Sequence, residues 1–223
     1  MMLKAQHALP DYSLIVLCGG QGSRLGGADK GLLRTAGENF VQRLIRKLAH
    51  PQGHVVISAN RHLDLYAREG HRVVPDLRAG YQGPLAGIEA ALLAGIPADR
   101  PVLVVPVDMP DLPADLPAAL LAQARPEQLV VVHDGQRLQP LCMMFFPGSW
   151  QVSLSTFLDA GGRSVRRWLA DKPLQQVQLL RPHAFENINE PADLLIRSKQ
   201  LLQNSAQYGL IGYDHPYEYQ RRQ

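Results

Sequence analysis

A glycine-rich segment that also carries two cations is the part of this 223-residue chain best suited to chemistry. Five glycines lie between positions 19 and 27, and Arg24 and Lys30 lie among and just after them. Glycine accepts positive φ angles and lets the backbone approach a ligand, so successive N–H groups can line a concave anion site. Arginine adds a planar fork and lysine a point charge, and both match phosphate oxygens. We interpret the segment as a phosphate-binding loop, with an ordinary surface loop as the alternative.

Two familiar phosphate-loop patterns do not fit this segment. A Walker loop requires Gly-x-x-x-x-Gly-Lys followed by Ser or Thr, and no such run occurs here. The dinucleotide fingerprint requires Gly-x-Gly-x-x-Gly, whereas Gly20, Gly22 and Gly26 are spaced by one residue too many. A phosphate-binding loop in this segment would therefore belong to a class other than these two.

Two aspartates follow apolar stretches that read as strands. Asp108 ends the stretch Pro101–Val107, and Asp76 follows a shorter one. Ligands of open parallel sheets bind beyond the carboxyl ends of the strands, and Mg²⁺ is held by one or two carboxylates together with water and substrate phosphates. Asp108 is thus a metal candidate, or else a turn or helix-capping residue. The Asp76 carboxylate could accept hydrogen bonds from guanine, or belong to a turn.

The segment from Leu17 to Lys30 resembles the signature of the MobA family of nucleotidyltransferases. It reads Leu-Cys-Gly-Gly-Gln-Gly-Ser-Arg-Leu-Gly-Gly-Ala-Asp-Lys, with Cys18 where the family usually has Ala. The resemblance extends over about residues 13 to 202. Three further segments match the family, namely Gly83–Gly87, Pro106–Pro110 and Asn187–Pro191.

The resemblance implies a reaction and the residues that carry it. GMP would pass from GTP to the terminal phosphate of molybdopterin carrying molybdenum, and pyrophosphate would leave. The expected catalytic residues are Arg24, Lys30 and Asp108. The expected nucleotide-binding residues are Leu17, Cys18, Gly19, Gly20, Lys30, Asp76 and Asp108. Asp108 and Asn189 would hold Mg²⁺, with Mn²⁺ as the alternative ion, although Asn189 could instead cap the following helix.

A phosphate acceptor needs little from the enzyme beyond alignment and charge neutralisation. A phosphate monoester is already anionic near pH 7, so no general base is required. By resemblance, Gln139, Pro140 and Arg163 belong to the acceptor half of the site. Ser58 stands where the family often has Asn, which leaves a nucleotide contact from that side chain open.

The same residues are compatible with two other kinds of function. A cytidylyltransferase or a sugar-phosphate nucleotidyltransferase of the same fold is one alternative, and a non-catalytic protein that handles GTP or the cofactor is another. The intact Gly26–Gly31 segment favours the guanylyl branch, and the retained Arg24, Lys30 and Asp108 favour an enzyme.

Composition excludes several other classes of protein. A formal charge of +3 is too small for the dense basic surface of a nucleic-acid binder. The two cysteines are far apart and form no CxxC pair. Neither a membrane span of about 18 apolar residues nor a signal peptide is recognisable. We expect a cytoplasmic monomer or weak homo-oligomer without nucleic-acid or membrane partners, which exchanges the cofactor with proteins that supply or receive it.

In the first half of the chain, short apolar runs typical of strands alternate with segments whose apolar residues have helical spacing. This order predicts a parallel sheet with helices on both faces. Strands are predicted at 14–17, 54–60, 72–74 and 101–108, and helices at 40–49, 63–68, 85–93 and 114–124.

The second half is less regular. An antiparallel hairpin is predicted from 129–133 and 141–146, followed by helices at 149–159 and 164–170, a strand at 176–180 and a helix at 192–202. We expect one α/β domain over residues 1–203, of the three-layer Rossmann-like type found in nucleotide-diphospho-sugar transferases. Its sheet would be mostly parallel with an antiparallel part, and residues 204–223 would form a tail of unknown role.

Overall fold

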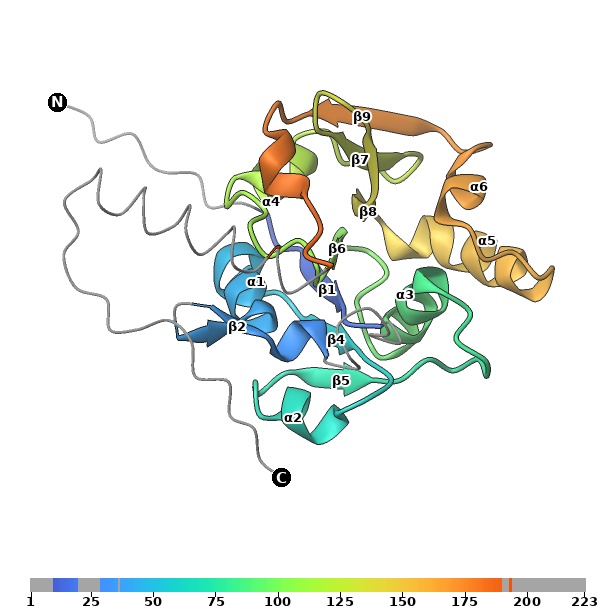
Figure 1. Ribbon diagram of the computed structural model, residues 1–223. Helices are drawn as coiled ribbons and strands as arrows, with labels where there is room; N and C mark the ends of the chain where they lie inside the picture. The colour runs from blue at the N-terminus through green and yellow to red at the C-terminus, as the bar shows by residue number, and fades with distance from the viewer. Residues whose placement is uncertain (1–9, 20–28, 36, 190–192, 194–223) are drawn as a thin grey trace, which may run out of the picture.

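A seven-stranded sheet forms the centre of the computed structural model, which describes residues 10–19, 29–35, 37–189 and 193 (Figure 1). The strand order is β5-β4-β1-β6-β8-β7-β9. The strands are β1 (Ser13–Leu17), β4 (Val55–Ser58), β5 (Arg72–Val74), β6 (Val102–Pro106), β7 (Leu129–His133), β8 (Leu138–Phe145) and β9 (Leu174–Gln178). All neighbours are parallel except those of β8, which runs antiparallel to β6 and β7. The predicted mostly parallel sheet with an antiparallel part is confirmed.

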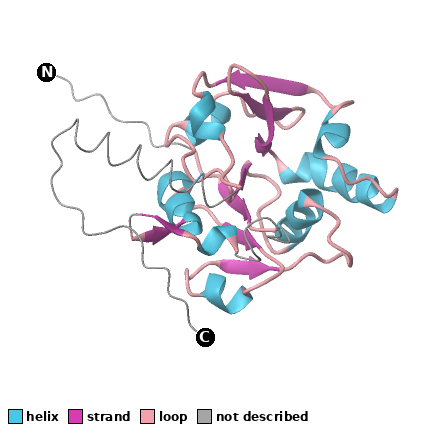
Figure 2. Cartoon of the chain, in the orientation of Figure 1, coloured by secondary structure: helices cyan, strands magenta, loops and turns pink. Residues whose placement is uncertain are grey.

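Helices cover both faces of this sheet and complete three layers (Figure 2). They are α1 (Phe40–Leu48), α2 (Leu63–Ala67), α3 (Pro84–Leu93), α4 (Leu116–Leu121), α5 (Pro147–Asp159) and α6 (Val165–Leu169). One apolar core joins the sheet to α1, α2 and α4, and the other joins it to α3, α5 and α6. Successive strand residues point to opposite faces, so Leu14 and Val16 enter the first core while Ile15 and Leu17 enter the second.

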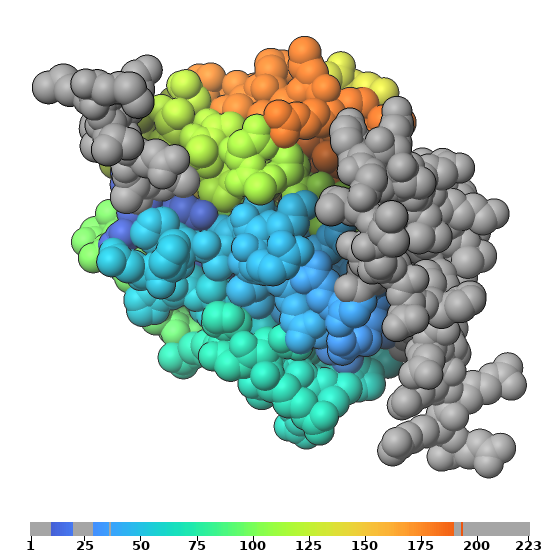
Figure 3. Space-filling view, turned by 90° about the vertical axis from the view of Figure 1, so that its left-hand side faces the viewer, coloured from blue at the N-terminus to red at the C-terminus, as the bar shows by residue number. Residues whose placement is uncertain are grey.

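Helices α1 and α4, which both pack on the first core, lie next to each other on the surface. Figure 3 shows the blue segment that contains α1 against the yellow-green segment that contains α4. Leu44 of α1 and Leu120 of α4 are both fully buried in the core between them. This packing holds α1 against the segment that follows β6. None of the helices in the part of the chain that the structure describes is long and apolar enough to cross a membrane.

The order of the strands creates a switch point at β1. The chain proceeds from β1 to β4 and β5 on one side and then returns to pair β6 on the other. In such sheets the crevice for ligands lies beyond the carboxyl ends of the strands at the switch point. The segments that follow Leu17 and Pro106 meet at this edge, where the sequence places its candidates.

The predicted elements and the observed ones differ mainly in short pieces. The structure adds a small hairpin, β2 (Arg34–Thr35) with β3 (Glu38–Asn39), and two 3₁₀ turns, η2 (Lys30–Leu32) and η3 (Pro182–Phe185). The predicted helix at 192–202, apart from Asp193, and the tail at 204–223 lie outside the described residues.

Candidate active site

Backbone hydrogen bonds prolong the central strands past their ends and so carry the candidate residues to one edge of the sheet. The amide of Val107 donates to the carbonyl of Leu17 at 3.0 Å, which ties the segment after β6 to β1. The amide of Cys18 donates to Ser58 at 2.8 Å on the other side of β1. Leu17 and Cys18, both predicted to bind the nucleotide, therefore lie between the ends of β4 and β6.

Lys30, Asp108 and Asn189 come together although they are far apart in the sequence. The Lys30 Nζ lies 3.3 Å from Asp108 Oδ2 and donates to Asn189 Oδ1 at 2.7 Å. The side chains of Lys30 and Asp108 are each 23% exposed, so the pair is partly shielded and still open to a ligand. Two oxygens from separate segments thus converge on one cation at the switch point.

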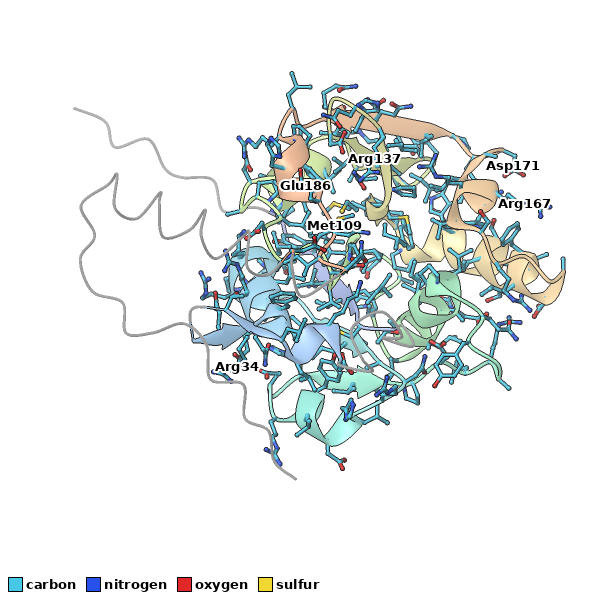
Figure 4. The ribbon with its side chains drawn as sticks, in the orientation of Figure 1. Arg34, Met109, Arg137, Arg167, Asp171 and Glu186 are labelled. Atoms are coloured by element: carbon cyan, nitrogen blue, oxygen red, sulfur yellow. The ribbon has the colours of Figure 1, made fainter. Side chains whose placement is uncertain are left out.

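The segment that carries Asn189 is fixed to Asp108 through the backbone. The Ile188 amide donates to the Asp108 carbonyl at 2.8 Å, and the Asn189 amide donates to the Asp193 carboxylate at 2.8 Å. The labelled Met109, which follows Asp108, lies near the middle of the molecule below Glu186 in Figure 4. Asn189 therefore reaches the site from a segment that follows the last strand of the sheet.

The residue before Lys30 caps the turn that carries it. Asp29 Oδ1 accepts a hydrogen bond from the Gly31 amide at 3.2 Å, and it also accepts one from the Tyr66 hydroxyl. Lys30 is the first residue of η2, so its backbone lies between the two ends of this cap. Arg24 and Gly20, the other candidates of the predicted phosphate loop, lie outside the described residues.

The two cysteines of the chain are both buried and form no disulfide. Burial, reinforced by the Asp29 carboxylate, raises the pKa of the Cys18 thiol well above its ordinary value. Burial likewise raises the pKa of Cys142. A thiol with a raised pKa stays protonated and unreactive near neutral pH. Cys18 therefore acts as a small core residue at the end of β1, as alanine would.

Asp76 is held at the same edge by a residue that the sequence did not single out. Asn60 Nδ2 donates to Asp76 Oδ2 at 2.9 Å, and the Asp76 amide donates to Asn60 Oδ1 at 2.8 Å. Burial raises the pKa of Asp76, and the hydrogen bond from Asn60 opposes this shift. A Cβ placed on Gly19 would lie 4.0 Å from Asn60 Nδ2, so Asn60 stands between Gly19 and Asp76. Its position two residues beyond the end of β4 was the available signal.

The side chain of Ser58 points away from this edge. It is 2% exposed, and a Cβ on Gly87 of α3 would lie only 2.4 Å from its Oγ. The close approach of α3 to β4 thus requires glycine at position 87. Ser58 contributes its carbonyl to the site, through the bond from Cys18, rather than its hydroxyl.

Two of the residues assigned to the acceptor half lie in β8, and the third, Arg163, follows α5. Arg163 borders the segment before α3, because a Cβ on Gly83 would lie 3.6 Å from the Arg163 carbonyl. Gly83 has a φ of 84°, a conformation that favours glycine. Gln139 is buried and donates to Asp134 at 2.6 Å, so its side chain serves the turn between β7 and β8. Pro140 lies beside it within β8.

Known proteins resemble this chain in sequence and in fold. The family model for the MobA-like NTP transferase domain matches residues 14–178. A curated relative from Shewanella amazonensis, named molybdenum cofactor guanylyltransferase, is 38% identical over 192 residues, which cover 85% of this chain and 96% of the relative.

Solved structures share the fold at low sequence identity. Molybdopterin-guanine dinucleotide biosynthesis protein A from Archaeoglobus fulgidus superposes with a TM-score of 0.68 at 22% identity, over 86% of this chain and 99% of the other. The 4-diphosphocytidyl-2C-methyl-D-erythritol synthase from Anaerococcus prevotii gives a TM-score of 0.64 at 10% identity, over 86% and 96%. With its sheet, its switch-point site and a family model that spans most of its length, the chain belongs to the family of MobA-like NTP transferases.

Proposed function

We propose that this protein transfers GMP from GTP to the terminal phosphate of molybdenum-bearing molybdopterin, forming the guanine dinucleotide cofactor and pyrophosphate. The name of the Shewanella relative supports this assignment. The observation that carries it is the convergence of Lys30, Asp108 and Asn189 at the switch point of the sheet. A cation and two oxygen ligands at that position suit a metal–triphosphate substrate.

The chemistry requires one bond to form as another breaks. An oxygen of the acceptor phosphate attacks the α-phosphorus of GTP, and the bond from that phosphorus to the pyrophosphate oxygen is cleaved. The attacking phosphate is already an anion, so it needs no proton acceptor. Lys30 offsets negative charge on the phosphates, and the segments after β1 and β6 hold the reactants in line. Arg24 and the amides of Gly19 and Gly20 are proposed to bind the departing phosphates.

The residues at the site fit a divalent cation. Asp108 and Asn189 offer oxygen atoms, which Mg²⁺ prefers, and these atoms already surround the Lys30 ammonium. No group of three or more His, Cys, Asp or Glu side chains in the described part of the chain could form a complete metal cage. We therefore propose that Asp108 and Asn189 hold Mg²⁺, or Mn²⁺ in its place, with substrate phosphates and water as the other ligands. Such an ion would neutralise phosphate charge.

The choice of GTP rests on Asp76. The fold alone does not select a nucleotide, because the Anaerococcus structure shares it. An ionised carboxylate can accept hydrogen bonds from both the N1–H and the exocyclic amine of guanine, whereas adenine and cytosine present no such pair of donors. Asn60 holds Asp76 Oδ2. We propose that the Asp76 carboxylate is the acceptor for the guanine base.

The decisive experiment measures pyrophosphate release from GTP, CTP and ATP with Mg²⁺, with and without molybdopterin, for the wild type and Asp108→Ala. We expect release from GTP alone, dependent on the acceptor, and a loss of about 10²-fold or more in the variant. Asp115→Ala is the control, because Asp115 is exposed and pairs with Arg181. Release from CTP would move the protein to the cytidylyl branch, and GTP binding without release would leave a non-catalytic binding protein.

We also propose that the enzyme works in the cytoplasm as a monomer or weak homo-oligomer, and that it exchanges the cofactor with proteins that supply and receive it. Support comes from the proposed reaction, whose acceptor and product both belong to a cofactor that other proteins must make and use. Sedimentation of the purified chain over a range of concentrations tests the oligomeric state.

A further inference from the structure

Tyr66 brings a buried hydroxyl to the turn that carries Lys30. Its side chain is fully buried in the core between the sheet and α1, and it comes from the short helix α2. Its hydroxyl donates to Asp29 Oδ1, the same oxygen that accepts the Gly31 amide. A residue from another element therefore shares the cap of η2.

Gly31, the residue after Lys30, leaves the space that Tyr66 occupies. A Cβ on Gly31 would lie 2.3 Å from the Tyr66 hydroxyl oxygen and 3.0 Å from two of its ring carbons. Gly31 does not have a positive φ, so the backbone conformation does not demand glycine there. The tight approach of Tyr66 is a separate reason for the residue type, because a Cβ at position 31 would meet the hydroxyl oxygen that donates to Asp29.

The Tyr66 hydroxyl remains a donor over the whole working range of pH. Burial, with the nearby Cys18 thiol and the Asp29 carboxylate, raises its pKa above the ordinary value. A hydroxyl that stays protonated has one proton to give, and in this structure Asp29 receives it. The Tyr66 hydroxyl therefore holds Asp29 in place as a hydrogen-bond donor.

This arrangement fixes the position of the Lys30 backbone. Its backbone lies between Asp29 and Gly31, both of which contact Tyr66, while its Nζ reaches Asp108 and Asn189. A charge that stabilises a transition state is effective only when it is fixed before the reaction begins. We propose that Tyr66 is a positioning residue for nucleotidyl transfer, acting through Asp29 on the turn that places Lys30. This inference rests on the proposed function.

The first test compares two tyrosines that each lose one buried hydroxyl. Tyr66→Phe should lower kcat for GTP-dependent pyrophosphate release by about tenfold, with a smaller change in KM, because misplacing a catalytic charge weakens the transition state more than the bound substrate. Tyr12→Phe is the matched control, since the Tyr12 hydroxyl is also buried and donates to Leu48 at 2.7 Å away from the site. The control should lower the unfolding temperature and leave kcat unchanged.

The second test asks whether Tyr66 acts through Asp29. In an Asp29→Ala background, adding Tyr66→Phe should cost little further activity, because the acceptor of the hydroxyl is already gone. Losses that multiply would overturn the proposal, as would wild-type kcat in Tyr66→Phe or an equal loss in Tyr12→Phe. Thermal unfolding of each variant shows that it is folded.

A third variant tests the contact from the other side and does not depend on removing Asp29. Gly31→Ala should reduce kcat, because a Cβ at position 31 would displace the Tyr66 hydroxyl from Asp29. Adding Tyr66→Phe to Gly31→Ala should then cost little further activity, and losses that multiply would contradict the proposal. An inactive wild type would instead refute the proposed function, so the two failures are distinguishable.

Discussion

At the scale of the residue, Asn60 holds Asp76, the proposed acceptor for the guanine base. It holds Asp76 by two hydrogen bonds, one to the side chain and one from the backbone. Asn60→Ala removes both, and a hydrogen bond to a charged group contributes about 1.5–3 kcal/mol. We expect kcat/KM for GTP to fall about tenfold or more, while the low activity with ATP or CTP changes little. Steady-state kinetics with the three nucleotides measure this ratio.

The same substitution has a signature in pH. Burial already raises the pKa of Asp76, and the bond from Asn60 lowers it. Removing Asn60 therefore raises that pKa further, so the carboxylate protonates at a higher pH. The acid limb of the GTP profile should move to higher pH in Asn60→Ala. Asn39→Ala is the control, because Asn39 is a buried amide that caps α1, and it should reduce stability without moving the limb.

Some of the side chains at the site could be predicted from the sequence, and others could not. Lys30, Asp108 and Asn189 were predictable because each follows a recognisable pattern, and the structure brings them together. Asn60 and Tyr66 were not, because each acts on a carboxylate far along the chain. No local period or propensity encodes such a pairing, and only the packing of the folded chain creates it.

At the scale of the element, Arg78 links the segment between β5 and α3 to two helices. Arg78 donates to both oxygens of Glu89 on α3, at 2.6 and 2.7 Å, and lies 2.7 Å from Asp159 at the end of α5. The Glu89 side chain is 5% exposed. Three segments that adjoin Asp76 and Arg163 are thereby held together, which makes the clamp part of the framework of the site.

Acid should weaken the ion pair between Arg78 and Glu89 over a defined range of pH. The hydrogen bonds from Arg78 hold the pKa of Glu89 below its usual value. Its contribution to stability is therefore complete above the unfolded value of about 4.3 and is lost as pH falls through the lower folded value. Glu89→Gln should have a melting temperature several degrees below that of the wild type at pH 7. This difference in melting temperature should disappear as pH falls below about 4. Melting curves across this range measure it, with the exposed Glu186→Gln as control.

A gap of constant size would mean that lost packing, rather than lost charge, destabilises Glu89→Gln. A similar closing gap in Glu186→Gln would assign the acid effect to the protein's overall charge. Glu186 is a fair comparison because it is 52% exposed and pairs with His183 in its own segment.

Long elements were predictable and short or irregular ones were not. The strands and helices of the first half carry clear apolar periods, and the structure has them within a few residues. The β2–β3 hairpin has two residues on each side, too few for any period. Strand β8 begins at Leu138, before the prediction, because the register shift between Val131 and Val132 lets the strand continue past Pro140, which lacks an amide hydrogen.

At the scale of the whole molecule, the site exists only in the folded chain. Its residues come from β1, the turn η2, the segments after β5 and β6, and the segment after β9, and positions from 17 to 189 meet at one edge. A ligand of this site binds the native state and has nothing comparable to bind in the unfolded chain. Binding must therefore stabilise the fold by mass action.

Melting with nucleotide and metal tests this coupling. At 100 times its dissociation constant, GTP with Mg²⁺ should add about 2.7 kcal/mol of stability, which for a chain of this size raises the melting temperature by about 5–10 °C. CTP should raise it less, because the Asp76 carboxylate finds no pair of donors on cytosine. A chelator should remove most of the GTP effect from the wild type and little from Asp108→Ala, where the metal oxygen is absent. A shift that survives chelation in the wild type would show that the triphosphate is held by cations of the chain alone, and Asp108 would then serve Lys30 rather than a metal.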